Sequence, residues 1–142
     1  MINKAKKLSY TEIKVGDSYS FSEIVTADKV YEFARLTGDY NPLHVNLKFG
    51  KRSIFGNNIA HGMFVASFFS KLIGMYCPGE RSLYLSQTLN FRKPVFFNDK
   101  ITVNGTVTDK ADSFNIVSIK MEISKEGIVL VDGIAMIKVL PI

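Results

Sequence analysis

A single apolar stretch near the middle of the chain limits the possible folds more than any other feature. The residues from Gly62 to Tyr76 are apolar on nearly every side of a helix, which is typical of a helix buried all round. About 15 residues at about 1.5 Å each reach about 22 Å, less than the roughly 30 Å hydrocarbon core of a membrane. Lys71 interrupts the stretch, and Pro78-Gly79 ends it. We therefore expect a central buried helix and no membrane span.

The chain after this helix has the pattern of successive β-strands. Apolar residues alternate with polar ones at period two, which predicts strands with one buried face. The alternating residues are Leu83, Leu85, Leu89 and Phe91, then Ile101, Val103 and Val107, then Val117, Ile119, Met121 and Ile123. Gly105 is expected to form a bulge, and Lys125-Glu126-Gly127 to form a turn.

The last run, from Ile128 to Leu140, is apolar on both faces, as expected for a strand covered by the helix on one side and by a partner on the other. One buried helix followed by long antiparallel strands predicts an α+β fold, in which a curved sheet wraps around the helix. One sheet face is left for packing in a dimer.

The first half of the chain predicts a strand and a short helix. Tyr19, Phe21 and Ile24 suggest one face of a strand that ends before Thr26. Thr26 is a suitable N-cap for a helix over residues 27–36, which Gly38 can end. Pro42 should keep the segment after Gly38 non-helical until His44, and a short helix is expected over residues 45–51. No linker or repeat divides the sequence, so we expect one domain over residues 1–142.

Composition excludes several classes of protein. Hydrophobic residues make up 46% and charged residues 22% of the chain, which is typical of a folded globular protein. The net charge of +5 suggests an anionic partner, but zinc spacings, basic helices and arginine–aromatic strands are absent, so we expect no nucleic acid. Cys77 is the only cysteine, which excludes an intrachain disulfide and fits a reducing compartment. No apolar run of signal-peptide length follows the N-terminus, and we expect a cytoplasmic protein.

An aspartate and a histidine lie five residues apart after the first helix. Asn41 and Pro42 restrain the loop between Asp39 and His44, so both side chains can point into one cleft. A carboxylate and an imidazole suit general acid–base chemistry on a small nucleophile such as water, with no metal or other cofactor. A simpler interpretation is that Asp39 only forms the turn and His44 is an ordinary polar residue.

A second feature directly precedes the central helix. In Ala60-His61-Gly62, free backbone amides at the helix start can receive the negative charge of a thioester carbonyl as it becomes an enolate. The simpler interpretation makes Gly62 a permissive cap and His61 a polar neighbour. Ser67 and Ser70 interrupt the apolar helix, and both can bond to the preceding turn.

Other hydrolytic chemistries lack their motifs. No Gly-x-Ser-x-Gly turn occurs, which disfavours a serine nucleophile. With only two histidines and no His/Glu pair at helical spacing, a zinc hydrolase lacks its ligands.

Two segments together resemble the MaoC-like (R)-specific enoyl-CoA hydratases. They are residues 33–44 (FARLTGDYNPLH) and residues 60–63 (AHGM), and the similarity continues through residues 84–91 and 93–99. The family has the hot-dog fold, an antiparallel sheet wrapped around a long helix. The resemblance implies reversible syn addition of water to a trans-2-enoyl-CoA, giving an (R)-3-hydroxyacyl-CoA.

The resemblance also implies roles for individual residues. Asp39 and His44 would hold and activate the water, and the N–H of Gly62 would bind the thioester oxygen. Asn41 would fix the loop, and Asn41, His61, Ser70 and Ile73 are counted as substrate-binding residues, with Ser70 and Ile73 along the acyl chain. No metal is implied.

The partners implied by the resemblance are a second copy of the chain and an acyl-CoA, or else an acyl carrier protein. Arg92 and Lys93 could contact the phosphates of CoA or could be ordinary solvent-facing residues. Two rival functions stay open. A hot-dog thioesterase would use a carboxylate to help water attack the carbonyl, and a non-catalytic protein of the same fold would only bind acyl thioesters.

Overall fold

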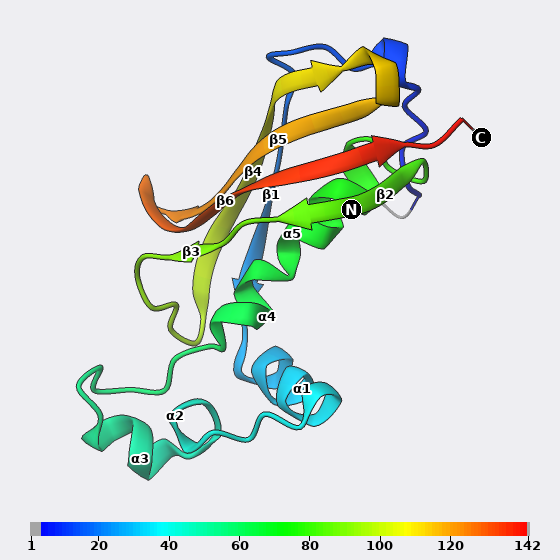
Figure 1. Cartoon of the computed structure of the whole chain (residues 1–142). Helices are drawn as coiled ribbons and strands as arrows, with labels where there is room; N and C mark the ends of the chain where they lie inside the picture. The colour runs from blue at the N-terminus through cyan, green and yellow to red at the C-terminus, as the bar shows by residue number, and fades with distance from the viewer. Residues whose placement is uncertain (1–3, 142) are drawn as a thin grey trace.

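A strongly curved antiparallel sheet is the largest structural element of the molecule (Figure 1). The computed structural model describes residues 4–141. The strand order is β1-β4-β5-β6-β2, and β3 pairs with β6 beside β2. The strands are β1 (Ser18–Val25), β2 (Ser82–Gln87), β3 (Asn90–Phe91), β4 (Asp99–Ala111), β5 (Ile116–Lys125) and β6 (Ile128–Val139).

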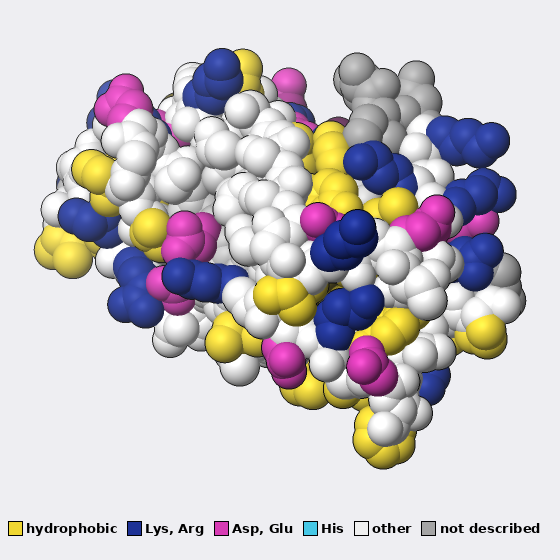
Figure 2. Space-filling view, turned by 90° about the horizontal axis from the view of Figure 1, so that it is seen from above, with side chains coloured by type: hydrophobic (Ala, Val, Ile, Leu, Met, Phe, Trp, Pro, Cys, Tyr) yellow, Lys and Arg dark blue, Asp and Glu magenta, His cyan; other side chains and the backbone are white. Residues whose placement is uncertain are grey.

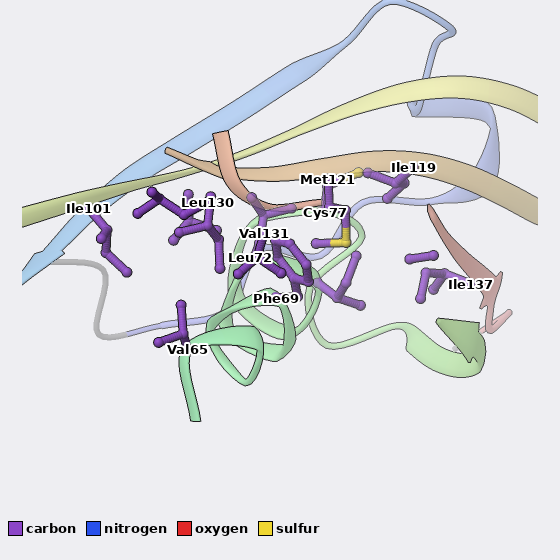
Figure 3. Close-up of a cluster of buried hydrophobic side chains, with 14 of the residues drawn as sticks. Val65, Phe69, Leu72, Cys77, Ile101, Ile119, Met121, Leu130, Val131 and Ile137 are labelled. Atoms are coloured by element: carbon purple, nitrogen blue, oxygen red, sulfur yellow. The ribbon is translucent and has the colours of Figure 1, made fainter. Parts of the chain in front are cut away.

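The predicted central helix lies against the concave side of this sheet (Figure 1). It consists of α4 (Gly62–Ala66), α5 (Phe68–Lys71) and a π-helical turn at Leu72–Tyr76, joined through Ser67 in right-handed helical geometry. Phe69 and Leu72 point from it into the apolar side chains of the sheet, as Figure 3 shows. The α+β fold, a sheet wrapped around this helix, is therefore confirmed.

The helix is not buried all round, and that expectation was wrong for the single chain. Met63 has 59% of its surface exposed, and Ser67 and Ser70 are exposed as well. Only one sheet packs on the helix, so only the face that carries Val65, Phe69, Leu72 and Ile73 is buried within the chain. The opposite face lies open.

Period two correctly identified the strands whose inner face packs on the helix. Val117, Ile119, Met121 and Ile123 of β5 are each exposed by 1% or less. The expected turn joins β5 to β6, and Glu126 and Gly127 have the positive φ angles of 50° and 79° that a tight hairpin requires.

Three details of the strands differ from expectation. The shift in pairing in β4 lies between Val107 and Asp109, and Gly105 pairs regularly with Met121. Gly105 instead makes room for the helix, because a Cβ there would lie 2.7 Å from the Leu72 side chain. Ile24 points outward, since Val25 takes the buried position at the end of β1.

The run over residues 83–91 is also not one alternating strand. A shift between Tyr84 and Ser86 and a break after Gln87 divide it into β2 and β3. Leu83, Leu85 and Phe91 are largely exposed. In β6, Ile128, Ile134 and Met136 are exposed on the outer face, which is consistent with the expectation that both faces of this run are apolar.

Three short helices form a separate cluster beyond the start of α4 (Figure 1). They are α1 (Ala27–Thr37), α2 (Pro42–Val45) and α3 (Leu47–Arg52). Thr26 caps α1 as predicted, accepting a hydrogen bond from the Lys29 amide, and α3 begins two residues later than expected. The prediction of a non-helical loop up to His44 was wrong, because Pro42 occupies the first position of α2, where its missing N–H costs nothing.

Basic and acidic side chains are interspersed on the surface. Lysine and arginine side chains alternate with acidic ones over the face seen in Figure 2, and neither histidine is visible there. None of the helices described between residues 4 and 141 is long and apolar enough to cross a membrane.

Candidate active site

The end of α1 determines where Asp39 lies. Gly38 has a φ of 82°, a left-handed conformation that ends the helix with its N–H bonded to the Ala34 carbonyl. Asp39 follows at once, and its Oδ1 accepts a hydrogen bond from the Asn41 amide at 3.1 Å. The Oδ1 of Asn41 in turn accepts from the Leu43 amide at 3.0 Å and caps α2. Asn41 therefore links the Asp39 loop to the start of α2.

His44 is held in one tautomer by the backbone. Its Nδ1 lies 2.7 Å from the carbonyl oxygen of Ile59, which can only accept, so Nδ1 carries the hydrogen. Burial lowers the pKa of His44 below its ordinary value, and the bond to Ile59 offsets part of that shift. At neutral pH the ring is therefore uncharged and Nε2 has a free lone pair.

His61 lies beneath the loop with only 2% of its surface exposed. Its Nε2 donates to the backbone carbonyl of Asp39 at 2.9 Å. Its ring packs at a tilt against His44, with 4.0 Å between centroids, and against Phe33, with 4.8 Å between centroids. Within the part of the chain that the structure describes, Nδ1 of His61 is buried without a hydrogen-bond partner. These contacts make His61 a support for the Asp39 loop.

The three side chains converge at one point. One nitrogen or carboxylate oxygen from each of Asp39, His44 and His61 lies within 4.8 Å of the other two, and the Asp39 carboxylate is half exposed. Oδ2 of Asp39 and Nε2 of His61 lie 4.0 Å apart, further than the about 3.3 Å between two ligands on one zinc at about 2.0 Å. The Nε2 of His61 is also occupied by the Asp39 carbonyl. The geometry suits a bound water better than a metal.

Gly62 is the first residue of α4 and directly follows His61. Its N–H has no hydrogen-bond partner among residues 4–141. The ring of Phe91 covers it, because a Cβ at this position would lie 2.9 Å from the ring. A side chain at this position would have to displace the half-exposed Phe91 ring, whereas the free amide of Gly62 is available to a ligand.

The other two predicted residues lie further along the central helix, on different faces. Ser70 is exposed and lines an open groove of about 510 Å³ together with Met63, Tyr84 and Leu89. Ile73 is 1% exposed and packs in the apolar core. The single chain thus brings Asp39, His44, His61 and Gly62 together, places Ser70 on an adjoining groove and leaves Ile73 inside the core.

One residue that supports this site was missed by the sequence analysis. Asn58 is 4% exposed, and its Nδ2 donates to the carbonyls of Leu43 at 2.8 Å and Asn46 at 2.9 Å. These bonds join α2 and α3 to the segment that carries His61. Gly50 permits the contact, since a Cβ there would lie 2.5 Å from Asn58. No periodicity or motif distinguishes Asn58 from the exposed Asn57.

Comparison with known protein sequences identifies the family of this chain. Residues 11–128 match the family described as MaoC like domain. A Rhodospirillum rubrum protein named (R)-specific enoyl-CoA hydratase is 34% identical over 92% of this chain and 90% of its own length. A Methylorubrum extorquens protein named 3-hydroxybutyryl-CoA dehydratase is 33% identical, covering 98% and 88%.

Solved structures have the same fold. The unliganded (R)-hydratase of Pseudomonas aeruginosa superimposes with a TM-score of 0.91 at 30% identity, covering 96% of this chain and 88% of that one. The (R)-hydratase of Aeromonas caviae involved in PHA biosynthesis gives 0.87 at 38% identity, covering 91% and 98%. The chain belongs to the MaoC-like dehydratase family and has its hot-dog fold.

Proposed function

We propose that the protein is an (R)-specific enoyl-CoA hydratase, which reversibly adds water to a trans-2-enoyl-CoA and forms the (R)-3-hydroxyacyl-CoA. The observation that carries the proposal is the meeting of Asp39 and His44 beside the free amide of Gly62. The relatives named as hydratases and dehydratases support the same reaction.

The water is bound between Asp39 and His44. Its two hydrogens point to the Asp39 carboxylate and to Nε2 of His44, which leaves an oxygen lone pair directed at C3 of the substrate. As the C3–O bond forms, one O–H bond breaks, and the proton passes through this pair to C2. Groups held in place for proton transfer typically contribute about 100-fold to 10,000-fold to the rate.

Gly62 stabilises the negative charge that develops during the addition. Attack at C3 moves electrons from the double bond to the thioester oxygen, and the Gly62 N–H donates a hydrogen bond to that oxygen. Such a donor acts mainly in the transition state, where the charge is largest, and losing one typically costs about 3 kcal/mol. His61 does not touch the substrate in this proposal but holds the carbonyl of Asp39.

The acyl chain lies in the groove beside Ser70. This groove contains no charged side chain and is bordered by Met63, Tyr84 and Leu89. Ile73, one helical turn beyond Ser70, packs in the core and does not line this groove. Phe64 and Phe68 do not line this groove, but the bulky side chains of Phe33 and Phe69 do, and they favour a short acyl chain such as crotonyl.

We further propose a homodimer as the working form. β2 is the last strand of the sheet, and its side chains Leu83, Tyr84 and Leu85 are exposed. A second copy that pairs along this edge would cover them and the open face of the central helix. The chain acts as one domain, and its single buried cysteine, Cys77, is compatible with the reducing cytoplasm.

The test is the absorbance of the enoyl-thioester band after purified protein is added to crotonyl-CoA, with a thiol reagent in a parallel sample. The proposal expects loss of the band, no free thiol and an (R)-alcohol on chiral analysis. Release of thiol would instead identify a thioesterase, and a bound but unchanged substrate would identify a binding protein. The Asp39→Asn variant in the same assay controls for a contaminating hydratase.

A further inference from the structure

Asp39 lies in the short link between α1 and α2, where apolar packing does not hold it (Figure 1). Its side chain is half exposed, and its neighbours Gly38 and Tyr40 are exposed as well. A carboxylate free to turn would bind a water in many directions, whereas proton transfer to a bound substrate needs one direction. The direction of this carboxylate therefore depends on hydrogen bonds, and three other residues make them.

Thr37 holds the amide of Asp39. The Thr37 hydroxyl donates to the Phe33 carbonyl at 2.8 Å, one turn back along α1. A hydroxyl has a single hydrogen, so the Thr37 oxygen acts as an acceptor toward the Asp39 N–H, whose nitrogen lies 3.2 Å from it. The bond to Phe33 fixes the side chain of Thr37 against the helix. The hydroxyl therefore ties the backbone of Asp39 to the last turn of α1.

His61 holds the carbonyl of the same residue. Its Nε2 donates to the Asp39 oxygen at 2.9 Å, from a ring that is only 2% exposed. The N–H and the C=O of Asp39 are thus both bonded, one to α1 and the other to the residue before α4. The backbone at Asp39 cannot rotate without breaking one of these bonds, so the direction of its Cβ is fixed.

The side chain of Asp39 keeps one free oxygen. Its Oδ1 accepts from the Asn41 amide at 3.1 Å. Within residues 4–141 its Oδ2 has no hydrogen-bond partner, and it lies 4.0 Å from Nε2 of His61. A carboxylate oxygen of Asp39 and a ring nitrogen of each of His44 and His61 lie within 4.8 Å of one another. Oδ2 is therefore the oxygen available to a water at this point.

We infer that Thr37 is a positioning residue of the reaction, and that together with His61 it fixes Asp39 so that Oδ2 alone receives the hydrogen bond of the attacking water. The inference rests on the proposed function and adds one residue and one oxygen atom to it. Thr37 does not touch the water or the thioester. It acts through Asp39, because its hydroxyl hydrogen is used by Phe33 and its oxygen by the Asp39 amide.

The first test compares two substitutions of Thr37 in the crotonyl-CoA assay. Thr37→Val removes the hydroxyl and keeps the branched shape, so kcat should fall about tenfold with KM within about twofold of wild type. Thr37→Ser keeps the hydroxyl, so kcat should stay within about threefold of wild type. An equal loss in the two variants would show that the methyl group matters and not the hydroxyl, and would overturn the inference.

A double-mutant cycle with Asp39→Asn tests whether Thr37 acts through Asp39. The residual hydration by Asp39→Asn is measured at high protein concentration, alone and combined with Thr37→Val. Once the carboxylate is gone, the loss of the Thr37 hydroxyl should have no further effect on kcat, because residues that act as a unit are not additive. If the double variant loses a further tenfold, Thr37 acts elsewhere and the inference fails.

Thr102→Val is the matched control. Thr102 is exposed on β4, and no hydrogen bond of its hydroxyl occurs in the described part of the chain, so kcat should not change. Amide hydrogen exchange gives a readout that does not depend on activity, since the Asp39 N–H should exchange faster in Thr37→Val at an unchanged melting temperature. Wild-type exchange or wild-type kcat in Thr37→Val would overturn the positioning role alone. If the wild-type protein does not hydrate crotonyl-CoA, the proposed function fails, and the role of Thr37 fails with it.

Discussion

The core and the helix cluster of this protein are held together by different interactions. In the core, β4, β5 and β6 pack apolar side chains on the central helix, and several of these are fully buried. In the cluster, α2 and α3 contain no buried residue other than Gly50. Hydrogen bonds from Asn58, His44 and His61 to backbone carbonyls hold that region instead.

The difference separates stability from activity. Apolar burial contributes most of the free energy of folding, so the core determines whether the chain folds. Hydrogen bonds contribute less on balance but fix direction, so the cluster determines where Asp39 and His44 point. Substitutions in the cluster should therefore lower activity more than stability, and substitutions in the core should lower stability more than activity.

The largest expected effect is on turnover and not on folding. Asp39→Asn and His44→Ala should each lower kcat for crotonyl-CoA hydration about 1000-fold, because each removes one acceptor of the attacking water. The melting temperature should change little, since neither side chain lies in the core. Asp28→Asn, in the exposed first turn of α1, is the matched control and should retain activity. Loss of folded structure in either variant would contradict the separation.

The reverse signature is expected for Leu72→Ala. Leu72 is fully buried between the helix and Gly105, so the cavity left behind should lower the free energy of unfolding by about 3 kcal/mol. Activity per folded molecule should stay within a few-fold of wild type. Leu36→Ala, at an exposed position, should change stability by less than about 0.5 kcal/mol. Urea unfolding measures the free energy of unfolding of both variants. An equal loss in Leu72→Ala and Leu36→Ala would contradict the packing of Leu72 in the core.

Asn58→Ala tests the connection between the regions. It removes donors to two carbonyls in the cluster and should lower the free energy of unfolding by about 1 to 3 kcal/mol. The loss should be local, with faster amide hydrogen exchange in α2 and α3 and a roughly tenfold lower kcat, because His44 loses its position. Asn57→Ala is the exposed control. Unchanged exchange in α2 would show that Asn58 does not hold this segment.

The smallest expected effect concerns pH. Burial lowers the pKa of His44 in the folded protein, so its Nε2 stays free of a proton to a lower pH than in an exposed histidine. The acid limb of kcat/KM for hydration should therefore have its midpoint below the ordinary value of about 6.5. A midpoint at or above that value would contradict neutral His44 as the acceptor. In the unfolded chain His44 is exposed and binds a proton at a higher pH than in the folded protein. Lowering the pH below about 6.5 therefore favours the unfolded state and reduces the free energy of unfolding.

The parts of the fold that could be predicted from the sequence are those whose structure is determined by one local sequence pattern. Period two identified the inner face of β5, because those side chains pack against a single helix. Thr26 and Gly38 correctly marked the ends of α1, because caps act within one turn. Asp39 and His44 could be predicted to lie close together because they belong to one short segment.

The remaining features depend on contacts between distant segments. Asn58 is buried only because Gly50 lets it reach Leu43 and Asn46, which no local pattern encodes. A glycine within a strand is typical of a bulge, but Gly105 instead leaves space for the side chain of Leu72, 33 positions away along the chain. The sequence predicted burial for the exposed face of the central helix because that face is apolar. An apolar pattern does not show whether the chain itself or another molecule covers the face.

The most direct test of the hydratase proposal is to follow the fate of the water oxygen. Crotonyl-CoA is incubated with the protein in H₂¹⁸O, and the products are analysed by mass spectrometry. The proposal predicts an intact thioester that carries ¹⁸O on C3 as the (R)-alcohol. Label in a free carboxylate, with CoA released as thiol, would show attack at the carbonyl and contradict the roles assigned to Asp39, His44 and Gly62.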